Sequence, residues 1–471
     1  MAVELEHSAL MQELALMQVE GGSPYFQMRA VIHVGGKEIV PLQILRKDVM
    51  RDYRKGFCDD TSIVFALGAG TLMNDIGPFQ DDIKVTLTIV DADTSGGEYT
   101  DRPAPTRTYC AYLGDDIPRP TDAAYNPSLS DSETADRSSM KYVAFVLEEV
   151  AVSQLTKMRL GYIGRSCPPF AVMEMLLGNS CKALKLGNDE AILGFDLTQP
   201  NNVTPRDHVI INDNTPVIDI PDLLQNEQGG IYSTGLGFYI QGAYIYTWPM
   251  FDCYRQDTAR RLLQVIMAPN RHSTMLDKTW RVSGRMVSVY SAGISKPIDD
   301  TFGQLNTEGN AVRFTSPSEL FSDDMQIGDN KMVAHRGKTN SEFATTVMGN
   351  GQNVANTAGT RVTSNVYLEA SKLARRAGAI MIVPWRRSNP DLITPGMAVE
   401  ILYDFNGVIR TIEGTLLSSD SSYELEGQGM QAYRFTAATA LSVFVDRNDP
   451  DYIDFIKGGG AVSPVPEIGS L

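Results

Sequence analysis

Apolar and polar residues alternate with a period of two along much of the N-terminal quarter of the chain. Residues 82–90 read DIKVTLTIV, where every second residue is apolar, which predicts a strand with one buried face. Residues 25–45, YFQMRAVIHVGGKEIVPLQIL, predict two strands around Gly35-Gly36, a dipeptide suited to a tight turn. A further strand is predicted over TRTYCAYL. We therefore expect a β-domain over residues 1–114.

The same alternation returns near the C-terminus, in ITPGMAVEILYDFNGVIRTIEGTLLSS. The Asn406-Gly407 dipeptide between its apolar runs is a strong short-range hairpin signal. Pairing across that turn predicts three facing pairs: Phe405 with Val408, Tyr403 with Arg410, and Ile401 with Ile412. The segments MQAYRFTA and TALSVFVD predict two more strands, which complete a second sheet or barrel.

Helical periodicity is confined to a few segments. The N-terminal MAVELEHSALMQELALMQVEGG predicts a short amphipathic helix. Its apolar positions are Leu5, Leu10, Leu14 and Met17. PPFAVMEMLLGNSCKAL begins with prolines that suit a first helical turn, and SNVYLEASKLARRAG has Ser364 as a cap and Gly378 as a stop. The expected class is mainly β, of the α+β type, with few helices.

Polar segments separate these elements. The region 115–140 is rich in Pro, Ser and Asp and predicts a linker or a loop, and 299–363 is polar with little periodicity. We expect the chain after Arg447 to be mobile. The predicted parts are the N-terminal β-domain over 1–114, the linker over 115–140, a middle α+β domain with an aromatic hairpin over 141–298, the polar segment over 299–363, a helix with C-terminal strands over 364–446, and a tail over 447–471.

The charge balance narrows the classes of function. The 471 residues include 41 basic and 57 acidic ones, which gives a net charge of −16. This argues against specific nucleic-acid binding and an anionic membrane surface, because both need clustered Lys and Arg. No run reaches 18 apolar residues, so no membrane span is predicted. The five cysteines include no CxxC pair, which indicates free thiols in a protein that is synthesised in a reducing cytoplasm.

The sequence contains no recognisable motif for catalysis, a metal or a cofactor. GLGFYI has Ile240 where the third glycine of a dinucleotide-binding loop would stand, and GRSCPP lacks the closing glycine of a nucleophile elbow. The five histidines are scattered, with no HExxH. DRNDPDYID resembles a calcium loop only superficially, since Pro450 interrupts it, so a solvated turn is favoured. We therefore predict no enzyme, no metal and no cofactor.

The stretch GLGFYIQGAYIYTWPMF, residues 235–251, is unusually rich in aromatic residues. A turn at Gln241-Gly242 sorts it into two faces, with Gly237 opposite Tyr246. One is an ordinary core face: Leu236, Phe238, Ile240, Ala243, Ile245 and Thr247. The other carries the candidate interface residues: Tyr239, Tyr244, Tyr246 and Trp248. Such a face suits a subunit interface or a second buried layer within the same chain. The stretch has no basic residue, which argues against base stacking.

The order of several segments carries a family resemblance. They are the strand pair with the Gly-Gly turn and FCDDTSIVFALGAGT, then PPFAVMEMLLGN, GIYSTGLGFYIQGAYIYTWPMFD, LNTEGNAVRF, and the closing ITPGMAVEILYDFNGVIRTIEGTLLSS. In this order, over roughly residues 25–445, the chain resembles the baseplate hub family at the tail tip of long-tailed bacteriophages. That family is related to the base of type VI secretion spikes.

The resemblance implies a non-enzymatic structural protein of the virion, made in the host cytoplasm and located at the tail tip or baseplate. It implies two tail-tube-like antiparallel β-barrel domains, near 24–114 and 390–446, joined by intervening mixed domains. A homotrimer then presents six barrels to a hexameric tail tube and seats the central spike protein. Tape-measure and baseplate wedge proteins are further expected partners.

Two alternatives stay open. One is another tail-tip component, such as a distal-tail or receptor-binding protein. The other is a carbohydrate-active β-enzyme that uses the aromatic face as a sugar platform.

Overall fold

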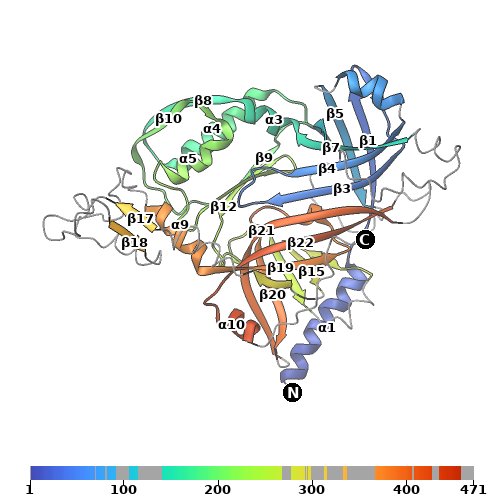
Figure 1. The fold of residues 1–471 in the computed structure, drawn as a ribbon. Helices are drawn as coiled ribbons and strands as arrows, with labels where there is room; N and C mark the ends of the chain where they lie inside the picture. The colour runs from blue at the N-terminus through green and yellow to red at the C-terminus, as the bar shows by residue number, and fades with distance from the viewer. Residues whose placement is uncertain are drawn as a thin grey trace.

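The computed structural model describes most of the chain and confirms a mainly β fold with few helices (Figure 1). The described residues are 2–68, 70–79, 82–91, 106–114, 140–267, 277–291, 293, 295–298, 312–315, 333–336, 366–405, 408–426 and 434–457. Residues 115–139 of the predicted linker, most of the polar segment at 299–363, the Ser364 cap and residues 458–471 lie outside them.

Eight strands close into a ring. Their order is β21-β3-β4-β7-β6-β5-β1-β22, and β22 pairs back onto β21. The strands are β1 (Tyr25–Val34), β3 (Gln43–Asp52), β4 (Asp60–Gly68), β5 (Ile83–Asp91), β6 (Thr106–Leu113), β7 (Met140–Glu149), β21 (Val408–Glu426) and β22 (Arg434–Asp446). The short β2 (Lys37–Ile39) pairs with β1 across the predicted Gly35-Gly36 turn, where both residues have positive φ. Alternating apolar side chains such as Ile32, Phe65 and Phe145 fill the interior of the ring with a packed core.

A second sheet continues from the same two long strands. It adds β13 (Leu262–Met267), β14 (Trp280–Ser283), β15 (Met286–Ser291), β16 (Ser295–Ile298), β19 (Gly378–Arg386) and β20 (Ala398–Phe405). The predicted register across the Asn406-Gly407 turn is confirmed in all three pairs, from Phe405 with Val408 to Ile401 with Ile412. β13 is parallel to both β15 and β20, whereas the other strands of this sheet pair antiparallel.

β21 and β22 belong to both sheets. β21 pairs with β20 as far as Thr415 and with β3 from Ser418, and an irregularity in its pairing with β22 lies between Leu416 and Ser418. Bulges of this kind bend a strand and let it pass from one sheet to another. β22 is a single strand, so the prediction of two separate strands there is wrong: no turn residue interrupts RFTAATALSVFVD. The two sheets therefore share continuous backbone.

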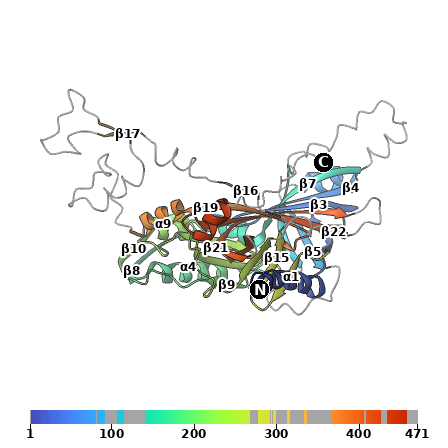
Figure 2. The same cartoon turned by 90° about the horizontal axis from the view of Figure 1, so that it is seen from below.

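A third layer of helices and short strands forms one end of the molecule and lies beside the ring, with α3 (Val150–Lys157) next to β7 (Figures 1 and 2). It contains α3, β8 (Arg159–Cys167), α4 (Pro169–Leu184), β10 (Arg206–Pro216) and α5 (Ile220–Asn226) around its own apolar core. α4 is the helix predicted from its N-terminal prolines, and α9 (Val366–Ala377) is the one predicted from Ser364. The remaining elements are β17 (Val312–Thr315), β18 (Val333–Arg336) and the short helices η1 (Thr71–Ile76), η2 (Gly77–Phe79), η4 (Val217–Asp219) and η8 (Pro390–Leu392).

Helices at both ends of the chain pack on the second sheet. The predicted N-terminal helix, α1 (Ala2–Glu20), buries Leu14 and Met17 in a cluster with Ile266 and Tyr290. The expected mobile tail is wrong for residues 450–457, which form α10 (Pro450–Lys457). Its Tyr452 and Phe455 are one helical turn apart and both lie in the apolar core, and Pro450 suits a first helical turn. None of the described helices is long and apolar enough to cross a membrane.

The aromatic hairpin and an adjacent polar pocket

The aromatic stretch forms a hairpin at the junction of the three layers. β11 (Leu236–Gln241) pairs antiparallel with β12 (Tyr244–Pro249), and β9 (Gly194–Leu197) adds to β12 in parallel. The turn is Gly242-Ala243, where φ is 58° and 75°, so the predicted turn is wrong by one residue. A two-residue hairpin turn of this type needs positive φ at both central positions.

Moving the turn by one residue changes the pairing but not the faces. Gly237 lies opposite Trp248 rather than Tyr246, and Tyr239 lies opposite Tyr246. The four aromatic residues still share one side of the hairpin, because a two-residue shift in register keeps every side chain on its face.

Much of the aromatic face packs within the same chain. Tyr239 is 0% exposed and Trp248 is 2% exposed, and both lie in the core of the second sheet. Tyr53 meets both rings edge-on, at centroid distances of 4.8 Å and 6.1 Å. The Trp248 ring also packs on the bare backbones of Gly237 and Gly396, where an added Cβ would overlap it. Tyr239 and Trp248 thus have no surface left for a second subunit, whereas Tyr244 and Tyr246 are only partly buried.

A buried ion pair fixes the tip of the hairpin to the ring. The Glu149 carboxylate accepts a hydrogen bond from the Gly242 N–H at 3.1 Å and another from Arg107 at 2.6 Å. Arg107 and Glu149 side chains are 6% and 9% exposed. The neighbouring Gln241 donates to the carbonyl of Ile393 at 2.6 Å, which also ties the tip to the segment between η8 and β20.

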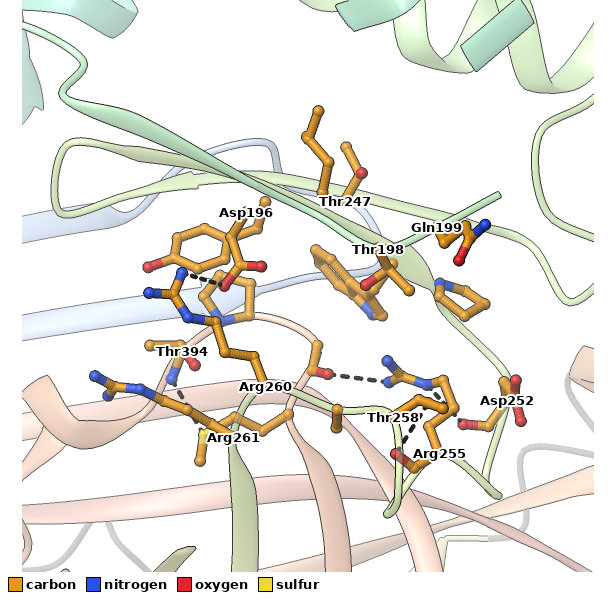
Figure 3. A pocket seen from close by; sticks show the side chains of 18 of the residues that line it. Asp196, Thr198, Gln199, Thr247, Asp252, Arg255, Thr258, Arg260, Arg261 and Thr394 are labelled. Carbon is orange, nitrogen blue, oxygen red and sulfur yellow. Dashed lines mark hydrogen bonds and ion pairs between the residues drawn. The ribbon is translucent and has the colours of Figure 1, made fainter. Parts of the chain in front are cut away.

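A polar pocket of about 580 Å³ opens beside the aromatic face (Figure 3). Its walls are the ends of β9 and β12, the segment 198–201 that follows β9, the loop 250–261 and the loop 394–397. The charged residues that line it are Asp196, Asp252, Arg255, Arg260 and Arg261. Tyr246, Trp248 and Tyr254 contribute aromatic rings. The volume is in the range of sites for small molecules, which is roughly 300–1,000 Å³.

Arg255, which is 5% exposed, is the buried cation of this pocket. Its guanidinium donates to three neutral oxygens: the carbonyls of Asp252 (3.3 Å) and Gly396 (3.0 Å) and Thr415 Oγ1 (2.9 Å). No carboxylate of the described residues accepts a hydrogen bond from it, although the charge of Asp252 acts on it. Burial lowers the pKa of Arg255 from its usual value, the direction expected when a cation leaves water.

Both carboxylates of the pocket already have partners. Asp196 forms an ion pair with Arg260 at 3.3 Å, and Asp252 accepts the backbone N–H of Tyr254 at 3.1 Å. A sugar platform needs an open ring face, and Trp248 at 2% exposure does not offer one. Among the described residues there is also no group of three or more His, Cys, Asp or Glu side chains that could hold a metal ion.

Sequence reasoning found the aromatic residues but missed Arg255 and its neighbours. A signal was present, because the basic cluster RQDTARR at 255–261 follows the aromatic stretch almost directly. What the sequence does not show is that only Arg255 of its three arginines is buried.

Comparisons with known proteins place tail proteins among the solved structures similar to this chain. No family model matches the sequence, and no curated protein matches it. The tail protein from Neisseria meningitidis MC58 is 11% identical with a TM-score of 0.37, over 90% of this chain and 97% of that one. The 43 kDa tail protein of prophage MuSo2 from Shewanella oneidensis is 9% identical with a TM-score of 0.38, over 88% and 98%.

A third similar structure is an E. coli component of the type VI secretion system. It is 10% identical with a TM-score of 0.38, over 89% of this chain and 77% of that one. These are the classes of protein that the sequence resemblance names. TM-scores this low carry no property of those proteins over to this chain.

Proposed function

We propose that the chain is a structural protein of a phage tail, and that three copies form the hub between a hexameric tail tube and a trimeric central spike. The observation that carries the proposal is the closed ring of strands that shares β21 and β22 with a second sheet. The shared strands join the ring and the second sheet in one subunit by continuous backbone. Three subunits would then present six such sheet units, which matches the six subunits of a hexameric tube.

The outer face of the ring supports contact with another subunit. Tyr112 and Val146 are direct cross-strand partners on β6 and β7, and they are 43% and 39% exposed. Tyr142, on β7, is 60% exposed. Neighbouring apolar side chains on an exposed sheet face are typical of interaction surfaces. The partly buried Tyr244 and Tyr246 remain the part of the predicted aromatic interface on which a partner has room to lie.

The test is the mass of the purified chain in solution, measured by light scattering after size-exclusion chromatography. We expect three times the mass of one chain at micromolar concentration. Tyr142→Glu together with Val146→Glu should shift the protein toward the monomer, because two charges then face the partner's apolar surface. Ile163→Glu is the matched control, since Ile163 is also an exposed apolar residue (74%) but lies on β8. A wild-type protein that stays monomeric would contradict the trimer.

A further inference from the structure

We propose that the pocket between the aromatic hairpin and the 250–261 loop binds a carboxylate, with the buried guanidinium of Arg255 as its counter-ion. This site is independent of the hub role, because it rests only on the side chains that line the pocket.

The Arg255 guanidinium is buried and donates to no carboxylate of the described residues. A buried charge is normally paired, and breaking such a pair is strongly destabilising. Arg255 is 5% exposed and donates only to neutral oxygens, through Nε and Nη2. Its Nη1 makes no hydrogen bond within the described part of the chain, and Arg255 lines the pocket. In Figure 3 the side chain extends from the loop toward the middle of the lining residues. The guanidinium therefore has both the charge and the donor for an anionic ligand.

Trp248 supplies a further unpaired donor in the same part of the structure. The indole Nε1 of Trp248 is buried and has no hydrogen-bond partner among the described residues. Trp248 also lines the pocket. Buried donors are nearly always satisfied, so the unpaired indole N–H of a residue that lines the pocket is a candidate donor to an acceptor that the ligand brings. Because the ring packs on Gly237 and Gly396, this donor has a fixed position.

The charges of the pocket favour a carboxylate over a phosphate. Three arginines and two aspartates line it, which leaves one net positive charge. One positive charge balances a monoanion, whereas the two carboxylates repel a doubly charged phosphate. A guanidinium also presents a planar fork of N–H groups that matches the two oxygens of a carboxylate. The ligand is either a free small carboxylate or a carboxylate carried by a polypeptide.

The experiment titrates the full chain by isothermal titration calorimetry with four probes. These are N-acetyl-trialanine with a free C-terminal carboxylate, its C-terminal amide, acetate and inorganic phosphate. We expect the free acid to bind saturably and the amide to bind at least about tenfold more weakly. The reason is that a hydrogen bond to a charged group contributes enough binding free energy to change the dissociation constant by about tenfold or more. Binding of the peptide acid well above acetate would indicate a polypeptide source, and equal binding of the two a free small carboxylate.

Variants assign the binding to Arg255. Arg255→Gln should lose at least about tenfold in affinity for the acid, and Arg255→Lys should lose less because the charge stays. Arg285→Gln is the matched control: Arg285 also donates to carbonyls of this loop, those of Asp257 and Ala259, but does not line the pocket. Equal binding of acid and amide, no binding of the acid, preference for phosphate, or undiminished binding by Arg255→Gln would each overturn the proposal. If Arg255→Gln fails to fold, the comparison of acid and amide on the wild-type protein still decides it.

Discussion

Replacing Trp248 with alanine is expected to lower the free energy of unfolding by about 3–5 kcal/mol, the range found when large aromatic residues are removed from a core. Trp248 is 2% exposed and contacts its cross-strand partner Gly237 as well as Tyr53 and Gly396, which come from distant parts of the chain. Its loss leaves a cavity where the hairpin meets the second sheet. Chemical denaturation followed by circular dichroism measures the effect.

Two further substitutions separate the packing of this ring from a general sensitivity of the hairpin. Gly396→Ala should also destabilise, because the added Cβ overlaps the Trp248 ring and Gly396 has a φ of 68°. Tyr244→Ala, on the same face but only partly buried, should cost much less. If Tyr244→Ala costs as much as Trp248→Ala, the ring is not the anchor that the structure indicates.

The strands could be predicted from the sequence because their signals are local. The alternation in DIKVTLTIV gives β5, and an Asn-Gly dipeptide between apolar runs gives the register of β20 and β21 to the residue. The closure of the ring could not be predicted. It depends on pairs such as Phe26 with Phe435, more than 400 residues apart by their numbers, and no local pattern specifies which distant strands meet.

The candidate site was predictable only in part, and for the same reason. The faces of the aromatic hairpin follow from a period of two, whereas the burial of Tyr239 depends on Tyr53, a residue from another layer. The turn was misplaced because Ala243 adopts positive φ, which a sequence argument assigns to glycine. No local sequence pattern indicates that Arg255 is buried, because its hydrogen-bond partners Gly396 and Thr415 lie far along the chain.

Glu149→Ala is expected to cost about 3–5 kcal/mol of stability, because it leaves the buried Arg107 guanidinium without its counter-ion. The same change removes the acceptor of the Gly242 N–H, so it also releases the tip of the aromatic hairpin from the ring. Hydrogen exchange at the amides of β11 and β12 should therefore become faster, beyond what the global loss of stability produces. Denaturant unfolding gives the first quantity and exchange mass spectrometry the second.

A matched exposed pair and a double variant show whether burial is the cause. Lys37→Ala breaks an ion pair of the same 2.6 Å length, to Asp75, but the Lys37 side chain is 65% exposed, so the loss should stay below about 1 kcal/mol. Replacing both buried partners, with Arg107→Met and Glu149→Leu, should recover much of the loss, because no uncompensated charge remains inside. If instead the double variant is as unstable as Glu149→Ala, the cost lies in the hydrogen bond to Gly242 and in packing rather than in the buried charge. The ion pair would then serve to position the hairpin and not to neutralise Arg107.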